Sequence, residues 1–161
     1  LGNSAWTYLS LIYSNLSRRS RLWFTFCAIF PPNTEIMKNN LIHLWMANEF
    51  ISSEENLEAE EVGDITWNEL YQKSFFTDVK TDDYSGDISF KMLGPVREFA
   101  ELVSNGKCVI LDNYKMTNLS TWTLHAGFGS DLLSFNKGAL QKAENLQTLY
   151  LLEFALYNTI S

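Results

Sequence analysis

The stretch that decides the fold spans residues 23–51 and reads WFTFCAIFPPNTEIMKNNLIHLWMANEFI. It predicts a helix over 19–30, which the pair Pro31-Pro32 ends, because proline cannot continue a helix. A second helix is predicted over 38–49, where apolar residues recur at three- and four-residue intervals. Both helices are apolar over much of their circumference, which predicts a compact helical core. The expected core residues are Trp23, Phe26, Cys27, Phe30, Leu41, Leu44, Trp45 and Phe50.

The residues that follow change from a helical period to an alternating one. A third helix is predicted over 57–72, and β-prone runs at 75–79 and 88–92 flank a turn-rich loop, which predicts a β-hairpin. Pro95 is expected to open a short helix at its first position. With a helix over 5–16 in front, the predicted fold class is mainly α, with the order of a winged-helix domain: three helices, a hairpin and a short helix. The residues expected to face inward from 57–72 are Leu57, Val62, Ile65 and Leu70.

Beyond the short helix the pattern weakens. Residues 108–111 are β-prone, and the apolar residues Trp122, Leu124 and Phe128 indicate that this part packs on something. The spacing of Leu146, Leu149 and Leu151 fits the opening of a leucine-rich repeat. The asparagine expected three residues later is replaced by Phe154.

Charge and composition exclude several classes of function. The 161 residues are 46% hydrophobic and carry a net charge of −7, which disfavours nucleic acid as a partner. In a DNA-binding winged helix the third helix would enter the major groove, and residues 57–73 hold five acidic side chains against Lys73 alone. The basic cluster Arg18-Arg19-Arg21 is typical of a solvated turn of helix. A winged-helix transcription factor is therefore the alternative class and not the favoured one.

Neither a membrane span nor a secretion signal is visible. No apolar run approaches the ~20 residues that cross a bilayer. The first residues, LGNSAWTYL, have no basic region and no small-residue cleavage site. We expect a piece of a longer, cytoplasmic protein.

Catalytic and metal-binding motifs are missing from the sequence. There is no Gly-x-x-x-x-Gly-Lys-Ser/Thr loop for phosphate, and His43 and His125 are too far apart in sequence for a local zinc motif. The aspartates of the loop 81–87 miss the ligand spacing of an EF-hand. Cys27 and Cys108 form no disulfide framework, and Cys27 is expected to be a buried free thiol. The sequence predicts a protein that is not an enzyme and holds no cofactor of its own.

Several separated motifs resemble plant intracellular disease-resistance proteins of the nucleotide-binding, leucine-rich-repeat class (the NB-ARC family). The resemblance runs from about Leu9 to Val103 and keeps the motifs in the family's order. They are Leu11-Ile12-Tyr13-Ser14-Asn15-Leu16, Cys27-Ala28-Ile29-Phe30-Pro31, Leu41-Ile42-x-Leu44-Trp45-x-Ala47, Phe50-Ile51, Val62-Gly63, Asn68-Glu69-Leu70 and Ser74-Phe75-Phe76.

The resemblance implies four parts and a regulatory role. Residues 1–17 would end a preceding helical subdomain, 18–104 would be the winged-helix domain, 105–140 a connecting segment and 141–161 a truncated first leucine-rich repeat. Such a domain would act as a non-catalytic lever in the defence response, closed over ADP at rest and swung away when ATP replaces it. Its partners would be the nucleotide-binding domain and the repeats of the same protein, with self-association on activation. A degenerate fragment that serves only as a scaffold is a further alternative.

One nucleotide-sensing motif of this family falls within the chain. Family members have methionine–histidine–aspartate where the wing strand meets the next helix, and the histidine faces the diphosphate of ADP. The matching residues here are Met92, Leu93 and Gly94. Leu93 cannot donate a hydrogen bond, and Gly94 has no carboxylate. The position is therefore either a degenerate sensor or simply an apolar strand end.

Overall fold

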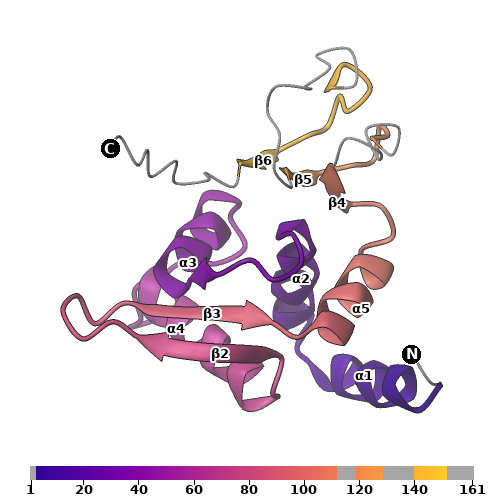
Figure 1. Ribbon diagram of the computed structural model, residues 1–161. Coiled ribbons are helices and arrows are strands. Elements are labelled where there is room, and N and C mark those ends of the chain that lie inside the picture. Colours follow the sequence, from indigo (N-terminus) through magenta and orange to yellow (C-terminus); the bar gives the residue numbers. More distant parts are fainter. Residues whose placement is uncertain (1–2, 112–118, 129–139, 152–161) are drawn as a thin grey trace, which may run out of the picture.

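The computed structural model describes residues 3–111, 119–128 and 140–151 as a helical body with a parallel sheet above it (Figure 1). The first half of the chain is mainly helical, and the second half is mainly extended. Their bounds are α1 (Asn3–Asn15), α2 (Arg18–Phe26), the 3₁₀ turn η1 (Cys27–Ile29), β1 (Ile36–Met37), α3 (Lys38–Ala47), α4 (Ala59–Gln72), β2 (Phe76–Thr81), β3 (Ile88–Met92), α5 (Gly94–Ser104), β4 (Cys108–Leu111), β5 (His125–Phe128) and β6 (Thr148–Leu151).

Residues 18–104 have the predicted order of a winged helix. The helices α2, α3 and α4 precede the hairpin of β2 and β3, and α5 follows it. The wing is a three-stranded antiparallel sheet in the order β1-β3-β2, so the short β1 adds a third strand to the expected hairpin. Of the helices in the described residues, none is long and apolar enough to cross a membrane.

Local chemistry fixes where the helices begin and end. Ser17 caps α2, because its Oγ accepts a hydrogen bond of 3.0 Å from the backbone N–H of Ser20. At the start of α4, the backbone N–H of Glu58 donates to the carboxylate of Glu61 over 2.8 Å. At the end of α5, Asn105 adopts the left-handed conformation with φ of 50°.

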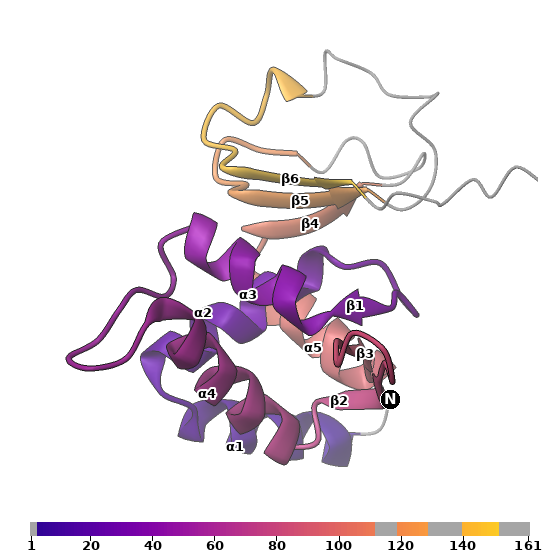
Figure 2. The ribbon, with the colours of Figure 1, turned by 90° about the vertical axis from the view of Figure 1, so that its left-hand side faces the viewer.

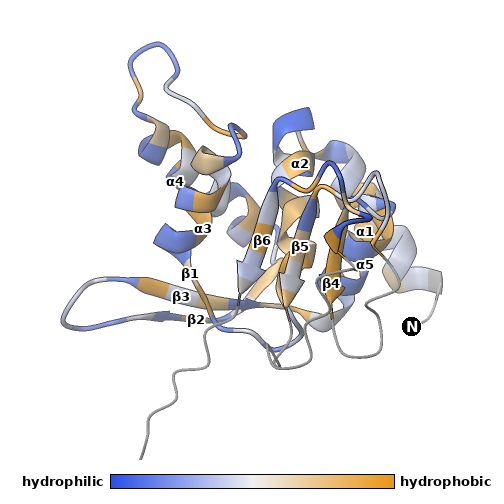
Figure 3. Ribbon diagram, turned by 90° about the horizontal axis from the view of Figure 1, so that it is seen from above, coloured by the Kyte–Doolittle hydropathy of each residue, from blue (hydrophilic) through white to orange (hydrophobic). Residues whose placement is uncertain are grey.

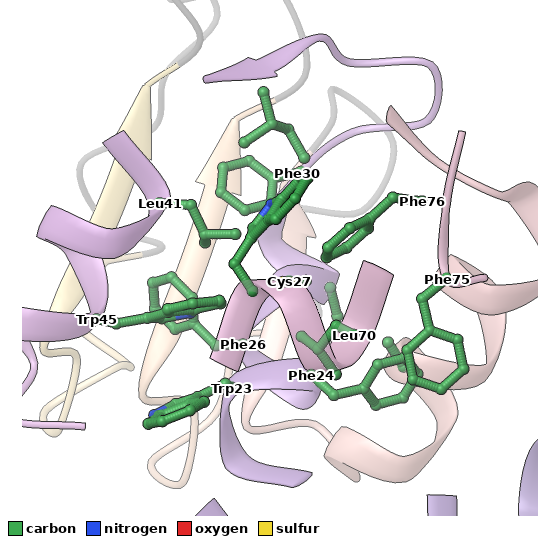
Figure 4. Close-up of a cluster of buried hydrophobic side chains, with 14 of the residues drawn as sticks. Trp23, Phe24, Phe26, Cys27, Phe30, Leu41, Trp45, Leu70, Phe75 and Phe76 are labelled. Carbon is green, nitrogen blue, oxygen red and sulfur yellow. The ribbon is translucent and has the colours of Figure 1, made fainter. Parts of the chain in front are cut away.

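An aromatic core joins these helices (Figure 4). The rings of Trp23 and Trp45 stack with centroids 5.3 Å apart and planes 17° from parallel. The Nε1–H of Trp23 donates to the carbonyl oxygen of Phe50 over 3.1 Å. Trp23, Phe26, Cys27, Phe30, Leu41 and Trp45 are fully buried, as predicted.

The face that α3 buries is turned slightly from the predicted one, and Leu44 and Phe50 still pack against the core. Ile42 is buried, whereas Leu44 is only half-buried, and so is Phe50 beyond the helix. The reason is the close packing of α3 on α4. A Cβ at Gly63 would lie 2.5 Å from the Cγ2 of Ile42, so the glycine makes room for that side chain.

The inward face of α4 also differs from the expectation. Val62 and Leu70 are buried as predicted, but Leu57 and Ile65 are 39% and 57% exposed. The helix is turned toward the wing because Trp67, 2% exposed, packs against Phe76 and Phe90 there, with ring centroids 5.3 and 5.5 Å away.

The second sheet is parallel, with strand order β4-β5-β6, and it lies over α2 and α3 in Figure 2. Cys108 pairs with His125, which pairs with Thr148, and the pairing continues residue by residue along the three strands without a register shift. Seen from above in Figure 3, the three strands lie side by side over the helices, and β4 is strongly hydrophobic. The predicted strand at 108–111 is confirmed. β5 lies in the predicted connecting segment, and Phe154 lies outside the described residues.

The aromatic core generates a paired test of the helix assignment. Trp45→Ala should lower the free energy of unfolding by roughly 3–5 kcal/mol, because a fully buried, stacked ring is replaced by a cavity. His43→Ala, an exposed position on the same helix, should change it by no more than about 0.5 kcal/mol. Chemical denaturation of both variants measures the difference. Equal losses of unfolding free energy in the two variants would show that the assignment of buried and exposed faces of α3 is wrong.

Candidate functional site

The three residues at the predicted sensor position lie together where β3 ends and α5 begins. Met92 pairs with Phe76 in the wing and is half-buried. The backbone N–H of Leu93 donates to the carbonyl oxygen of Phe75 over 3.3 Å. Leu93 is the N-cap of α5, and Gly94 is the first residue of the helix. The prediction placed Gly94 before the helix, so the helix begins one residue earlier than expected.

This position offers backbone groups and no side-chain chemistry. The side chain of Leu93 is 39% exposed and makes no capping hydrogen bond. A Cβ at Gly94 would meet nothing within 4 Å, so the space beside this residue is open. Pro95 has no N–H, which leaves fewer free donors in the first turn.

A cation missed by the sequence analysis lies one turn into the same helix. The Nε–H of Arg97 donates to the carbonyl oxygen of Phe30 over 3.0 Å, and its Nη1 lies 3.2 Å from a carboxylate oxygen of Glu101. Its side chain is 11% exposed. Arg97 therefore holds α5 to the end of the 3₁₀ turn, with its charge balanced by Glu101.

The second feature is the junction between the helical body and the parallel sheet, which no sequence motif indicated. Here β5 touches η1 through backbone atoms. A Cβ at Gly127 would lie 1.8 Å from the carbonyl oxygen of Ile29, a distance that no side chain allows. The absence of a side chain at Gly127 lets the two segments come together.

Aromatic rings flank this contact on both sides. His125 packs edge-on against Phe26 and Phe50, with ring centroids 5.0 and 5.5 Å away. Tyr150 on β6 packs edge-on against Phe30, with centroids 4.9 Å apart. Such aromatic pairs contribute ~0.5–1.5 kcal/mol each beyond the area they bury. The sheet is thus held over the 3₁₀ turn at several points.

A chain of polar side chains also crosses the junction. The Oδ1 of Asn48, just after α3, accepts a 2.7 Å hydrogen bond from the hydroxyl of Thr148, 100 residues away in sequence. The Nδ2 of Asn48 donates back to the carbonyl oxygen of Leu44 over 2.8 Å. The Nδ1 of His125 lies 3.1 Å from the hydroxyl oxygen of Thr148. Since the hydroxyl proton is already used, Nδ1 must carry the proton it donates, and the ring is the neutral Nδ1–H form.

Burial keeps the titratable groups of the junction neutral. It lowers the pKa of His125 to about 4, because the charged ring would lose its hydration. Burial raises the pKa of Cys27 well above its usual range and that of Cys108 to about 12. Both cysteines are buried free thiols, so the prediction for Cys27 is confirmed. Thiols with raised pKa values are poor nucleophiles, and in the part of the chain that is described no group of three acidic, histidine or cysteine side chains could hold a metal ion.

The close approach of β5 to η1 predicts that Gly127→Ala is strongly destabilising. A methyl group would have to push against the backbone of Ile29, and the unfolding free energy should fall by at least ~2–3 kcal/mol. Chemical denaturation provides the measurement. Gly94→Ala is the matched control, because its methyl group meets open space at a helix start and should be neutral or stabilising. Similar losses in the two variants would contradict the packing of the sheet.

Buried His125 also predicts that the protein loses stability in mild acid. Its folded pKa lies below the unfolded value of 6.5, so the unfolded state takes up the proton first. Neutral His125 makes its full contribution to the free energy of unfolding above pH 6.5. That contribution falls by roughly 2–3 kcal/mol as the pH falls toward 4. In His125→Gln, which cannot titrate, the unfolding free energy should change less over this window. Parallel pH profiles of wild type and variant would contradict the burial of His125.

Comparison with known proteins fits this geometry. The family described as the winged-helix domain of disease resistance proteins matches residues 29–100. The disease resistance protein RGA4 of Solanum bulbocastanum is 35% identical over 145 residues, which is 89% of this chain and 14% of the relative. RGA2 of the same species is 32% identical over 145 residues, 89% of this chain and 15% of the relative. RPM1 of Arabidopsis thaliana is 30% identical over 94 residues, 58% of this chain and 10% of the relative.

The chain therefore spans about a seventh of the length of the first two relatives. The matched segment begins in the 3₁₀ turn and ends within α5, so it contains both the wing and the predicted sensor position. The order of the described helices and hairpin is that of a winged-helix domain. This chain belongs to the plant disease-resistance proteins, and residues 29–100 form their winged-helix domain.

Proposed function

We propose that the chain is a non-catalytic regulatory module of a plant immune receptor, which passes the nucleotide state of a neighbouring domain to leucine-rich repeats. The winged helix would be the moving part, and the parallel sheet the first strands of the repeats. Two features support the second assignment: the strands pair in parallel and in step, and Leu146, Leu149 and Leu151 have the spacing of a repeat.

The observation that carries this proposal is the rigid junction. A lever needs its two ends to move together, and a flexible linker between them would absorb the motion. Here the backbone contact of Gly127 with Ile29 and the hydrogen bond of Thr148 to Asn48 tie the sheet to the helical body. A rotation of the winged helix would therefore carry the sheet with it.

The sensor position suits nucleotide in one respect and not in another. Leu93 and Gly94 are exposed and the space beside Gly94 is open, and the positive end of a helix favours phosphate. Leu93 supplies no donor, however, and Gly94 no carboxylate. We propose that the longer protein holds ADP weakly at this contact, so that its resting state is less firmly closed.

The DNA-binding alternative finds no support in the structure. α4 occupies the place of a recognition helix, and its exposed side chains include Glu60, Glu61 and Asp64. These carboxylates would repel a phosphate backbone.

The test is ADP binding by the full-length protein and by its Leu93→His, Gly94→Asp double variant. A hydrogen bond to a charged group is worth ~1.5–3 kcal/mol, so the double variant should bind ADP roughly ten- to a hundredfold more tightly. Calorimetry measures both affinities. The 161-residue chain alone should bind no ADP in the same experiment.

Two results would contradict the proposal. Equal ADP affinity of the two full-length proteins would show that Leu93 does not occupy the sensor position. Failure of both to bind nucleotide would favour the scaffold alternative over a switch.

A further inference from the structure

A groove in the helical body, lined by none of the residues at the predicted sensor position, has no role in the proposed function. It lies between α2 and α4 and has a volume of about 350 Å³, and its lining includes the ion pair of Arg19 with Glu54. Ser17, Arg19, Ser20, Trp23, Glu54, Leu57, Val62, Ile65, Thr66 and Glu69 line it.

The groove exposes apolar side chains that the fold does not use. Ile65 on α4 is 57% exposed and Leu57 just before the helix is 39% exposed, although their spacing matches that of core residues. Val62, 4% exposed, forms part of the wall between them. Exposed apolar side chains that gather along a groove are typical of a binding surface.

The α4 side of the groove is strongly acidic, whereas Arg18, Arg19 and Arg21 lie on α2. Residues 54–73 hold seven carboxylates and one lysine, Lys73. Arg19 pairs with Glu54, and Lys38 pairs with Asp64 over 2.8 Å. The other five carboxylates have no ion pair with any described residue; they are Glu55, Glu58, Glu60, Glu61 and Glu69.

We propose that this groove docks an amphipathic helix of another domain of the same polypeptide, with an apolar face flanked by lysine or arginine. A helix suits the groove because most of its lining side chains belong to α2 and α4, and no named strand contributes an edge to which an extended peptide could pair. Lysine or arginine flanks suit it because the α4 side of the groove carries carboxylates without an ion pair to any described residue, including Glu69 in its lining. α4, with 14 residues, is ~21 Å long and matches about four turns of such a helix.

A shallow groove is sufficient for a partner on the same chain. Linked segments reach effective concentrations in the millimolar range, so a weak contact can still be occupied most of the time. The position of α4 is that of the recognition helix in DNA-binding winged helices. In this chain that face would bind a basic protein helix in place of DNA. This inference does not depend on the nucleotide proposal and can fail without it.

The experiment titrates the 161-residue chain into a fluorescent 14-residue peptide of leucine and lysine, with leucines at helical spacing. At ~50 mM salt we expect micromolar binding, which weakens as salt rises. Ile65→Ser should weaken binding about tenfold, because one exposed apolar side chain contributes ~1.5 kcal/mol when buried. Glu69→Gln, which keeps an acceptor for Ser20, should weaken it about threefold at low salt only.

Matched controls distinguish binding in this groove from non-specific binding. Leu11→Ser alters an equally exposed apolar residue, 61% exposed on α1, and should leave the affinity unchanged. A peptide with glutamate in place of lysine should not bind. Equal affinities of wild type and Ile65→Ser, with both folded by circular dichroism, would overturn the proposal. So would binding of the glutamate peptide, or binding of a labelled DNA duplex that Ile65→Ser weakens.

Discussion

The segment 26–30, at the end of α2 and through η1, is shared by two packing layers. On one side Phe26 and Phe30 belong to the aromatic core of the winged helix. On the other side the same two rings meet His125 and Tyr150 of the parallel sheet. The carbonyl oxygen of Phe30 also holds Arg97 of α5. A change in this short segment would disturb the helical body, the parallel sheet and α5 together. The proposed movement of the winged helix and the sheet as one unit therefore depends on it.

The elements that sequence predicts well are those set by local chemistry. The two helices predicted over 19–30 and 38–49, the hairpin and the strand at 108–111 follow from period, proline and glycine. All are present, although the first helix ends at Phe26 and continues as a 3₁₀ turn, and the second ends at Ala47. The errors concern rotation about the helix axis. Ile42 is more deeply buried than Leu44 because Gly63 opens a space for it on α4, and that contact cannot be predicted from α3 alone. Trp122 was expected to pack and is 64% exposed, although its ring edge lies beside Gly106.

The junction could not have been predicted from the sequence. Its partners lie far apart, as with Asn48 and Thr148, and a parallel sheet pairs strands that local pattern does not connect. Gly127 resembles any loop glycine, and His125 resembles a solvated histidine, until the backbone of Ile29 and the rings of Phe26 and Phe50 are placed around them. The junction of β3 with α5, where the sensor is predicted, could in contrast be located from sequence, because it lies at the end of a predictable strand.

The missing side chain at Gly127 also determines which alignment of the sheet is allowed. Successive residues of a strand face opposite sides, so sliding β5 by one position would turn Ala126 or Phe128 toward the carbonyl oxygen of Ile29. Neither side chain could fit there. Short strands in a small sheet have few hydrogen bonds with which to choose between alignments. One glycine against a fixed backbone therefore excludes the wrong ones, and through β5 it also fixes the alignment of β4 and β6.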